Sequence, residues 1–159
     1  MNQKPTIVFA SDHAGFELKN VLLAYVQDEL GHEVIDCGAE IYDESDDYPI
    51  FIRKAAQMVS ENPNDYRAII LGGSGQGEAM TANRFKHVRA TAFYGEPLGS
   101  ELSIIRLSRE HNDANILSIG ARFVTIEAAK DAVKQWLTIE FSGDERHSRR
   151  NESIDTLTA

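Results

Sequence analysis

The stretch Ala68-Ile69-Ile70-Leu71-Gly72-Gly73-Ser74-Gly75-Gln76-Gly77-Glu78 decides the fold of this chain. Its apolar start predicts a buried strand, its glycines predict a bare loop, and the residues from Ala79 onward predict a helix. A loop without Cβ atoms can turn its amide N–H groups toward one point, and the first turn of the helix adds more unpaired donors. The stretch therefore predicts a site for an anion or a developing oxyanion.

Glu78 distinguishes this loop from a nucleotide-binding P-loop. A P-loop carries Lys and then Ser or Thr after its last glycine. Here a carboxylate stands in that place, and it would repel a phosphate docked on the same amides. An acid in the first turn of a helix is also favourable for structural reasons alone, and the helix dipole should keep it ionised and lower its basicity. We interpret Glu78 as a residue that takes part in the chemistry of the site.

Short apolar runs alternate with amphipathic runs along the rest of the chain. This pattern predicts strands at 6–10, 33–36, 68–71, 89–93 and 116–119, and helices at 16–30, 49–61, 102–109 and 125–137. Gly31 is placed to end the first helix, and Thr125 to begin the last long one. Helices between successive strands imply a parallel sheet covered on both faces, with its ligand site beyond the strand C-termini. We expect an α/β, Rossmann-like three-layer sandwich with a five-stranded parallel sheet and a C-terminal helical tail.

Length and composition narrow the class of protein. The 159 residues suit one domain, 1–159, and the net charge of −9 argues against binding to nucleic acid or to an anionic membrane surface. The sequence shows neither a signal peptide nor an apolar run long enough to span a bilayer, so a cytoplasmic protein is expected. The single cysteine, Cys37, can form no internal disulfide and is given no catalytic role.

Unusual residues lie next to three predicted strands. Ser11 to Gly15 follows the first strand, the glycine loop follows the third, and His111-Asn112-Asp113 and Gly120-Ala121-Arg122 flank the fifth. We expect these segments to converge on one site. Asp12 also suits a helix N-cap, and His111 suits a helix C-terminus. For His13, the functional interpretation is binding of a sugar hydroxyl or a phosphate, and the structural interpretation is a solvent-exposed side chain. For His111, the functional interpretation is a general acid.

The C-terminal tail carries local charge that opposes the charge of the whole chain. Three arginines and a histidine fall within Arg146 to Arg150. A solvated basic turn explains such a run, and so does a phosphate clamp built from arginine forks. No spacing of His, Cys, Asp and Glu matches a metal site, so we expect no metal and no cofactor.

Six motifs, in order, resemble the ribose-5-phosphate isomerase B and galactose-6-phosphate isomerase family. They are Ser11-Asp12-His13-Ala14-Gly15, Asp47-Tyr48-Pro49, Gly73-Ser74-Gly75-Gln76-Gly77, Ala82-Asn83, His111-Asn112-Asp113-Ala114-Asn115 and Arg146-His147-Ser148-Arg149-Arg150. The resemblance runs from about Ile7 to about Ile154. It implies a metal-free aldose–ketose isomerase that interconverts D-ribose 5-phosphate and D-ribulose 5-phosphate through an enediolate. It further implies a homodimer or a dimer of dimers, with active sites between subunits and residues 142–159 packing on a partner.

The resemblance also implies roles for single residues. Many members carry the catalytic base as a cysteine at the position of Gly72, whereas another branch uses a glutamate at the position of Glu78. The loop amides with Ser74 would form the anion hole, and His111 would be the ring-opening acid. The implied substrate-binding residues are Asp12, His13, Tyr48, Gly73, Gly75, Gly77, Asn112, Arg122, Arg146 and Arg150. In the family His111 and the tail arginines come from across the dimer interface.

One departure and two other functional classes keep alternatives open. The segment 96–111 is longer than is usual in the family and should lie beside the pocket, which leaves galactose 6-phosphate, allose 6-phosphate or a tetrose phosphate as possible substrates. A serine hydrolase would use Ser74 with His111 or His147, although the glycine spacing does not match a nucleophile elbow. A nucleotide-binding module would need a glycine fingerprint that the first strand turn lacks.

Overall fold

A five-stranded parallel sheet forms the middle of the molecule, with strand order β2-β1-β3-β5-β4. The computed structural model describes residues 4–96 and 102–157. The strands are β1 (Thr6–Ser11), β2 (Val34–Asp36), β3 (Tyr66–Gly72), β4 (Ala90–Phe93) and β5 (Ile116–Gly120). Each begins and ends within two residues of its predicted position. The predicted fold class is confirmed.

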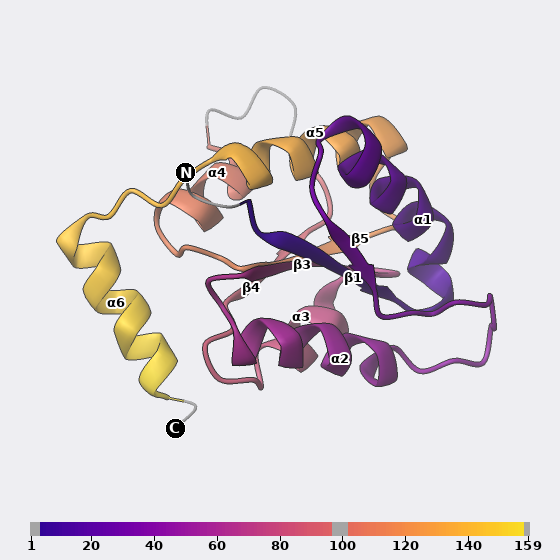
Figure 1. Cartoon of the computed structure of the whole chain (residues 1–159), viewed down its shortest axis with the longest axis horizontal. Helices are drawn as coiled ribbons and strands as arrows, with labels where there is room; N and C mark the ends of the chain where they lie inside the picture. Colours follow the sequence, from indigo (N-terminus) through magenta and orange to yellow (C-terminus); the bar gives the residue numbers. More distant parts are fainter. Residues whose placement is uncertain (1–3, 97–101, 158–159) are drawn as a thin grey trace.

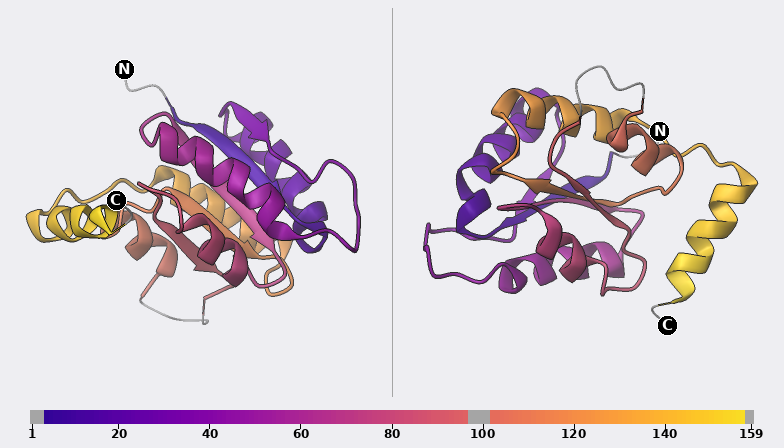
Figure 2. Two further views of the ribbon diagram at one scale, coloured as in Figure 1. Left: turned by 90° about the horizontal axis from the view of Figure 1, so that it is seen from below. Right: turned by 180° about the vertical axis from the view of Figure 1, so that it is seen from behind.

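Helices cover both faces of the sheet (Figure 1). One layer contains α1 (Phe16–Ala24), its π-helical continuation η2 (Tyr25–Glu29), α4 (Ile104–Glu110) and α5 (Ile126–Thr138). The other contains α2 (Tyr48–Glu61) and α3 (Gln76–Ala82). The two layers are seen above and below the sheet in the right-hand view of Figure 2.

Alternation along the strands builds a core on each side of the sheet. On β3, Ile69 and Leu71 pack in the cluster under α1 and α5, whereas Ala68 and Ile70 pack in the cluster over α2. Successive strand side chains point to opposite faces, so a strand covered on both faces reads as one continuous apolar run. This is why Ala68 to Leu71 is apolar throughout.

The predicted helix ends are confirmed. The Thr125 side chain accepts a hydrogen bond from the Ala128 N–H at 3.1 Å, which caps α5. Gly31, directly after the end of the first helical stretch, has φ +67°, the left-handed conformation that glycine adopts most easily.

Helix α6 (Glu145–Thr156) stands outside the two layers (Figures 1 and 2). Both Asp155 oxygens accept hydrogen bonds from Arg89 Nη1, at 2.8 and 2.7 Å, and the Asn151 side-chain amide donates to the His111 carbonyl at 3.2 Å. These contacts tie the helix to the segments that precede β4 and β5. Throughout the described part of the chain, no helix has both the length and the apolar character needed to cross a bilayer.

Candidate functional site

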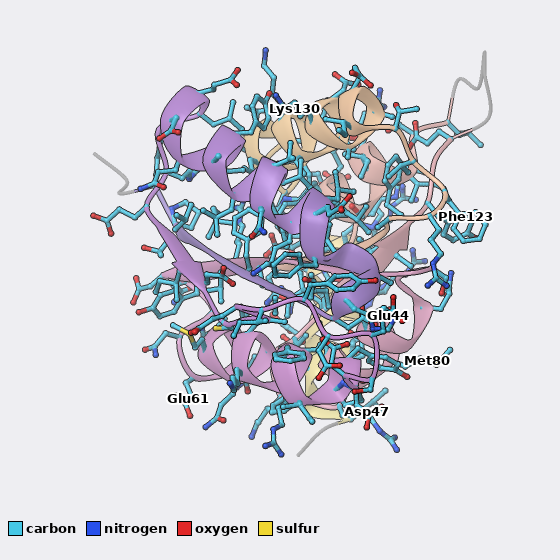
Figure 3. The ribbon with its side chains drawn as sticks, turned by 90° about the vertical axis from the view of Figure 1, so that its right-hand side faces the viewer. Glu44, Asp47, Glu61, Met80, Phe123 and Lys130 are labelled. Atoms are coloured by element: carbon cyan, nitrogen blue, oxygen red, sulfur yellow. The ribbon has the colours of Figure 1, made fainter. Side chains whose placement is uncertain are left out.

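The segments that follow β1, β3 and β5 meet at one edge of the sheet and line a cleft of about 590 Å³. Carboxyl ends of parallel strands lie at the same edge, so the predicted convergence is confirmed for these three segments. Phe123 lies exposed at this end of the molecule (Figure 3). The lining residues are Asp12, His13, Ala14, Tyr48, Gly73, Ser74, Gly77, Glu78, Arg122 and Phe123.

The glycine loop is pressed against the end of β5. Gly75 has φ +76°, and a Cβ there would lie 3.0 Å from the carbonyl carbon of Ile119. The Ser118 hydroxyl donates to the Gly75 carbonyl at 2.6 Å. The Gly73 carbonyl accepts from the Arg122 N–H at 3.1 Å. Engaging these carbonyls removes acceptors from the loop, as an anion hole made of N–H donors requires.

Glu78 is a nearly buried carboxylate in the first turn of α3, with an exposed fraction of 3%. Burial raises its pKa, and the charge of Asp12 raises it further, although a bond from its own backbone N–H acts the other way. The helix terminus was expected to lower the basicity of Glu78, and burial, which raises the pKa, is the larger influence. A Cβ on Gly72 would collide with the Glu78 carboxyl group, so this carboxylate occupies the space beside the end of β3.

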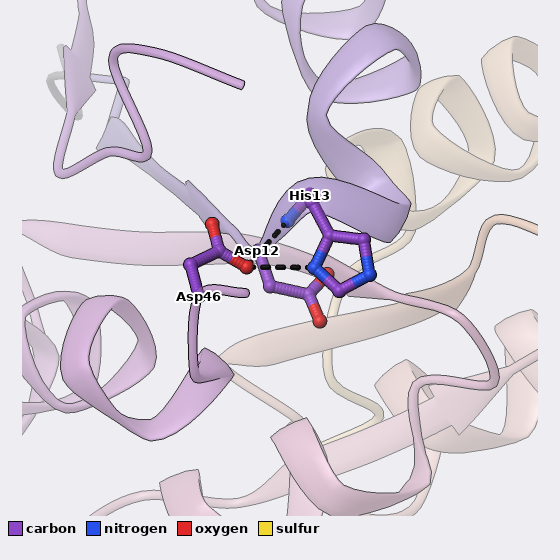
Figure 4. A group of neighbouring side chains, drawn as sticks. All are labelled: Asp12, His13 and Asp46. Carbon is purple, nitrogen blue, oxygen red and sulfur yellow. Dashed lines mark hydrogen bonds and ion pairs between the residues drawn. The ribbon is translucent and has the colours of Figure 1, made fainter. Parts of the chain in front are cut away.

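Asp12 and His13 form the turn after β1, which continues as the short 3₁₀ helix η1 (His13–Gly15). Asp12 Oδ1 accepts from the N–H groups of Ala14 at 3.0 Å and Gly15 at 3.3 Å, so the predicted capping role is confirmed. Nδ1 of His13 lies 2.7 Å from Oδ1 of Asp46, and a dashed line marks this hydrogen bond in Figure 4. This hydrogen bond is the largest cause of a raised pKa for His13.

Asp46 was missed by the sequence reasoning. It is 33 residues from His13, in the acidic loop before α2, and no fixed spacing links the two. The fold also brings polar atoms of Asp12, His13 and Asp46 within 4.8 Å of one another, a proximity that the spacing of these residues in the sequence did not reveal. The 2.7 Å separation between His13 and Asp46 is that of a charge-assisted hydrogen bond.

Tyr48 and Arg122 bring further polar groups to the glycine loop. A Cβ on Gly77 would collide with the Tyr48 hydroxyl, so that hydroxyl lies directly against the loop. A Cβ on Gly73 would lie 3.2 Å from Nη1 of Arg122. Arg122 thus supplies the cation that the sequence of the glycine loop itself lacks.

The structure does not bring His111, Asn112, Arg146 and Arg150 to this cleft within one chain. His111 is the C-cap of α4 and precedes β5, so it lies at the opposite edge of the sheet from the strand C-termini. The expectation of convergence is wrong for His111 and Asn112 in a single chain, because residues before and after a parallel strand are separated by its length. Arg146 and Arg150 lie on α6, which packs near the same opposite edge.

A second imidazole accompanies His111. The ring of His147 stacks on it, with centroids 4.1 Å apart and planes 14° from parallel. Burial is the main cause of a lowered pKa for His147, and nearby His111 adds to it. Neither ring is placed to activate Ser74, whose hydroxyl instead accepts from the Gln76 N–H at 3.3 Å. The serine hydrolase alternative gains no support from this geometry.

The lengthened segment 96–111 is described in part, since residues 97–101 lie outside the described residues. Oε1 of Glu96 accepts from the Ser103 hydroxyl at 3.1 Å and from the Ile105 N–H at 3.2 Å. Glu96 and Ile105 line a neighbouring cleft that shares Phe123 with the first one.

Known proteins match nearly the whole chain. Residues 7–154 match the family model described as Ribose/Galactose Isomerase. A ribose-5-phosphate isomerase B of Mycolicibacterium paratuberculosis is 40% identical over 95% of this chain and 88% of its own length. That of Escherichia coli is 38% identical, covering 95% of each. The crystal structure of ribose-5-phosphate isomerase B from Mycoplasma genitalium with bound ribulose-5-phosphate gives a TM-score of 0.87 at 33% identity, over 96% of this chain and 95% of the other.

Proposed function

Because the chain belongs to the ribose/galactose isomerase family and is a sugar-phosphate isomerase of the EC 5.3.1 class, we propose that it interconverts D-ribose 5-phosphate and D-ribulose 5-phosphate without a metal. The names of the relatives and the ligand of the Mycoplasma genitalium structure support this substrate. The observation that carries the reaction type is the buried Glu78 carboxylate of raised pKa beside a glycine loop.

In the proposed reaction, Glu78 removes the proton from C2 of the open-chain aldose, which leaves an enediolate with its negative charge on O1. The same group returns the proton to C1 while the proton of the C2 hydroxyl passes to O1, so that C2 becomes the ketone carbonyl and C1 becomes a hydroxymethyl group. Amides of Gly73 to Gly77 and the Ser74 hydroxyl stabilise the charge that develops on oxygen. A carboxyl whose pKa is raised by burial is a stronger base than an exposed one, which suits it to this transfer.

The position of Gly72 supports the choice of Glu78 as base. In family members with a cysteine at this position, a thiol would extend from the end of β3. Here a Cβ at Gly72 would run into the Glu78 carboxyl group. A glycine at 72 and a glutamate at 78 therefore fit each other, with the carboxylate in the space that the other side chain would enter.

Substrate binding in the proposed complex uses two copies of the chain. Asp12, His13, Tyr48 and Arg122 come from the cleft of one copy. The ring-opening acid His111, together with Asn112, Arg146 and Arg150, would come from the opposite edge of a second copy, in a homodimer or dimer of dimers. Their distance from the cleft of their own chain supports this assignment, as does the exposure of the apolar Met80 and Phe123 (Figure 3).

The test is ribulose 5-phosphate formation from ribose 5-phosphate with excess chelator present, compared with isomerisation of allose 6-phosphate and galactose 6-phosphate. We expect ribose 5-phosphate to give the highest kcat/KM, unchanged by the chelator. A preference for a hexose phosphate would overturn the substrate, loss of activity with chelator would overturn metal independence, and no turnover of any sugar phosphate would overturn the proposal.

A further inference from the structure

Asp46 is an almost buried carboxylate with no direct step in the proposed reaction. Its side chain is 8% exposed. Oδ1 accepts two hydrogen bonds from one residue, at 2.7 Å from Nδ1 of His13 and at 3.0 Å from the His13 backbone N–H (Figure 4). Both the turn after β1 and the plane of the imidazole are therefore held by one oxygen.

The hydrogen bond between His13 and Asp46 determines whether Nε2, the other ring nitrogen of His13, acts as a hydrogen-bond donor or acceptor. Nε2 lies on the side of the ring away from Asp46 (Figure 4), and His13 lines the cleft. Within residues 4–96 and 102–157, no hydrogen bond to Nε2 is formed. A neutral ring that donates Nδ1–H presents an acceptor at Nε2, whereas an imidazolium presents a charged donor there. Only the charged donor suits an anionic oxygen.

The surroundings favour the imidazolium. Oδ2 of Asp46 is buried without a hydrogen-bond partner in the described chain, so the carboxylate depends on His13 for countercharge. Asp12 and Asp46 both raise the pKa of His13, while Arg122 and partial burial lower it. The titratable and charged groups that face His13 or share its cleft are Asp12, Tyr42, Asp43, Asp46, Tyr48, Glu78 and Arg122.

We propose that Asp46 is a positioning residue, which holds His13 as an imidazolium whose Nε2–H binds an anionic oxygen of the substrate. In the proposed reaction that oxygen belongs to the phosphate group, so the identity of the ligand rests on the proposed function. The pairing of His13 with Asp46 does not, because both of its hydrogen bonds lie within the free chain.

The experiment compares the wild-type enzyme with Asp46→Asn, His13→Gln and the double variant, with Asp47→Asn as the matched control. Asp47 is adjacent, exposed (Figure 3) and makes no side-chain capping bond. The kcat and KM for ribose 5-phosphate are measured across pH. In parallel, NMR of ¹⁵N-histidine-labelled protein follows the His13 titration, assigned by its absence from His13→Gln, with and without inorganic phosphate.

We expect Asp46→Asn to lower the titration midpoint of His13 and to raise KM about tenfold near pH 7.5, with a much smaller change in kcat. The increase in KM should fade at acidic pH, where His13 is charged in both proteins. The double variant should be no worse than His13→Gln, because the two residues act as one unit. The control should match the wild type.

Three outcomes would overturn the inference: an unchanged His13 midpoint in Asp46→Asn, a loss in kcat at constant KM, or additive effects in the double variant. If the wild type turns over no pentose phosphate, the proposed function fails separately. The His13 titration and its response to inorganic phosphate then decide the inference: a midpoint lowered by Asp46→Asn, with a phosphate response weakened by the same change, supports it, and the absence of either overturns it.

Discussion

Glu78 is subject to two opposing influences. The N-terminal turn of α3 favours its charged form, and burial disfavours it, with burial the larger influence on the pKa. Keeping a charge in this place weakens the fold, and the same desolvation strengthens the base. Stability and turnover should therefore respond in opposite directions when the charge is removed.

Glu78→Gln should make the protein more stable at pH 7. A carboxyl whose pKa is higher in the folded than in the unfolded protein loses stability as pH rises from its ordinary value of 4.5 through the folded value. We expect the melting temperature to rise by about 2–4 °C at pH 7, equivalent to about 1 kcal/mol in a domain of this size. The difference should vanish near pH 4. A lower melting temperature at pH 7, measured by calorimetry, would contradict this account.

Gly72→Ala should impair catalysis through Glu78. The added methyl group would collide with the carboxyl group and displace it. We expect kcat to fall at least about tenfold with little change in KM, since the displaced group is the base and not a binding residue. Circular dichroism controls for folding, and a kcat equal to that of the wild type would show that the space beside the end of β3 is not critical.

At the scale of the elements, the buried side chain of Lys19 anchors the loop between β2 and α2. Lys19 of α1 is fully buried and donates to both oxygens of Asp36 at 2.7 Å and to the Ala39 carbonyl at 2.9 Å. Farther along, the same loop carries Asp46. The contacts of Lys19 therefore link the packing of α1 to the position of Asp46 beside His13 of the cleft.

Lys19→Met should destabilise the fold by about 3 kcal/mol, because it removes the countercharge of Asp36 and leaves the Ala39 carbonyl without its side-chain donor. Urea unfolding measures the change, and Lys86→Met, at an exposed position, is the control. We also expect a higher KM for ribose 5-phosphate, since the loop with Asp46 loses an anchor. A loss below about 1 kcal/mol would mean that the pair contributes little more than an exposed one.

The elements themselves could be predicted because their signals are local. The apolar run before the glycine loop and the Thr125 cap each specify a short piece of backbone, and parallel topology then places Asp12, Glu78 and Arg122 at one edge. Asp46 could not be found this way, since its partner is distant in sequence. The predicted position of His111 was wrong because its motif lies before β5, at the opposite end of the strand from the cleft.

The proposed assembly makes a prediction for the whole molecule. Glu78 and His111 lie at opposite edges of one chain, so an active site shared between copies would take one from each. Glu78→Gln and His111→Asn should each be nearly inactive alone. After mixing, unfolding and refolding together, heterodimers would contain one intact site, and about a quarter of the wild-type activity should return. No recovery, with heterodimers shown by mass spectrometry, would contradict the shared site.

The most direct test of the central claim is the turnover of ribose 5-phosphate by Glu78→Gln, with Glu127→Gln as the control. Glu127 is also a glutamate in the first turn of a helix, but it is exposed. If Glu78 is the base, kcat falls by about 10²–10⁴ while KM stays close to that of the wild type, and the control is unaffected. A Glu78→Gln enzyme with near wild-type kcat would show that another group moves the proton.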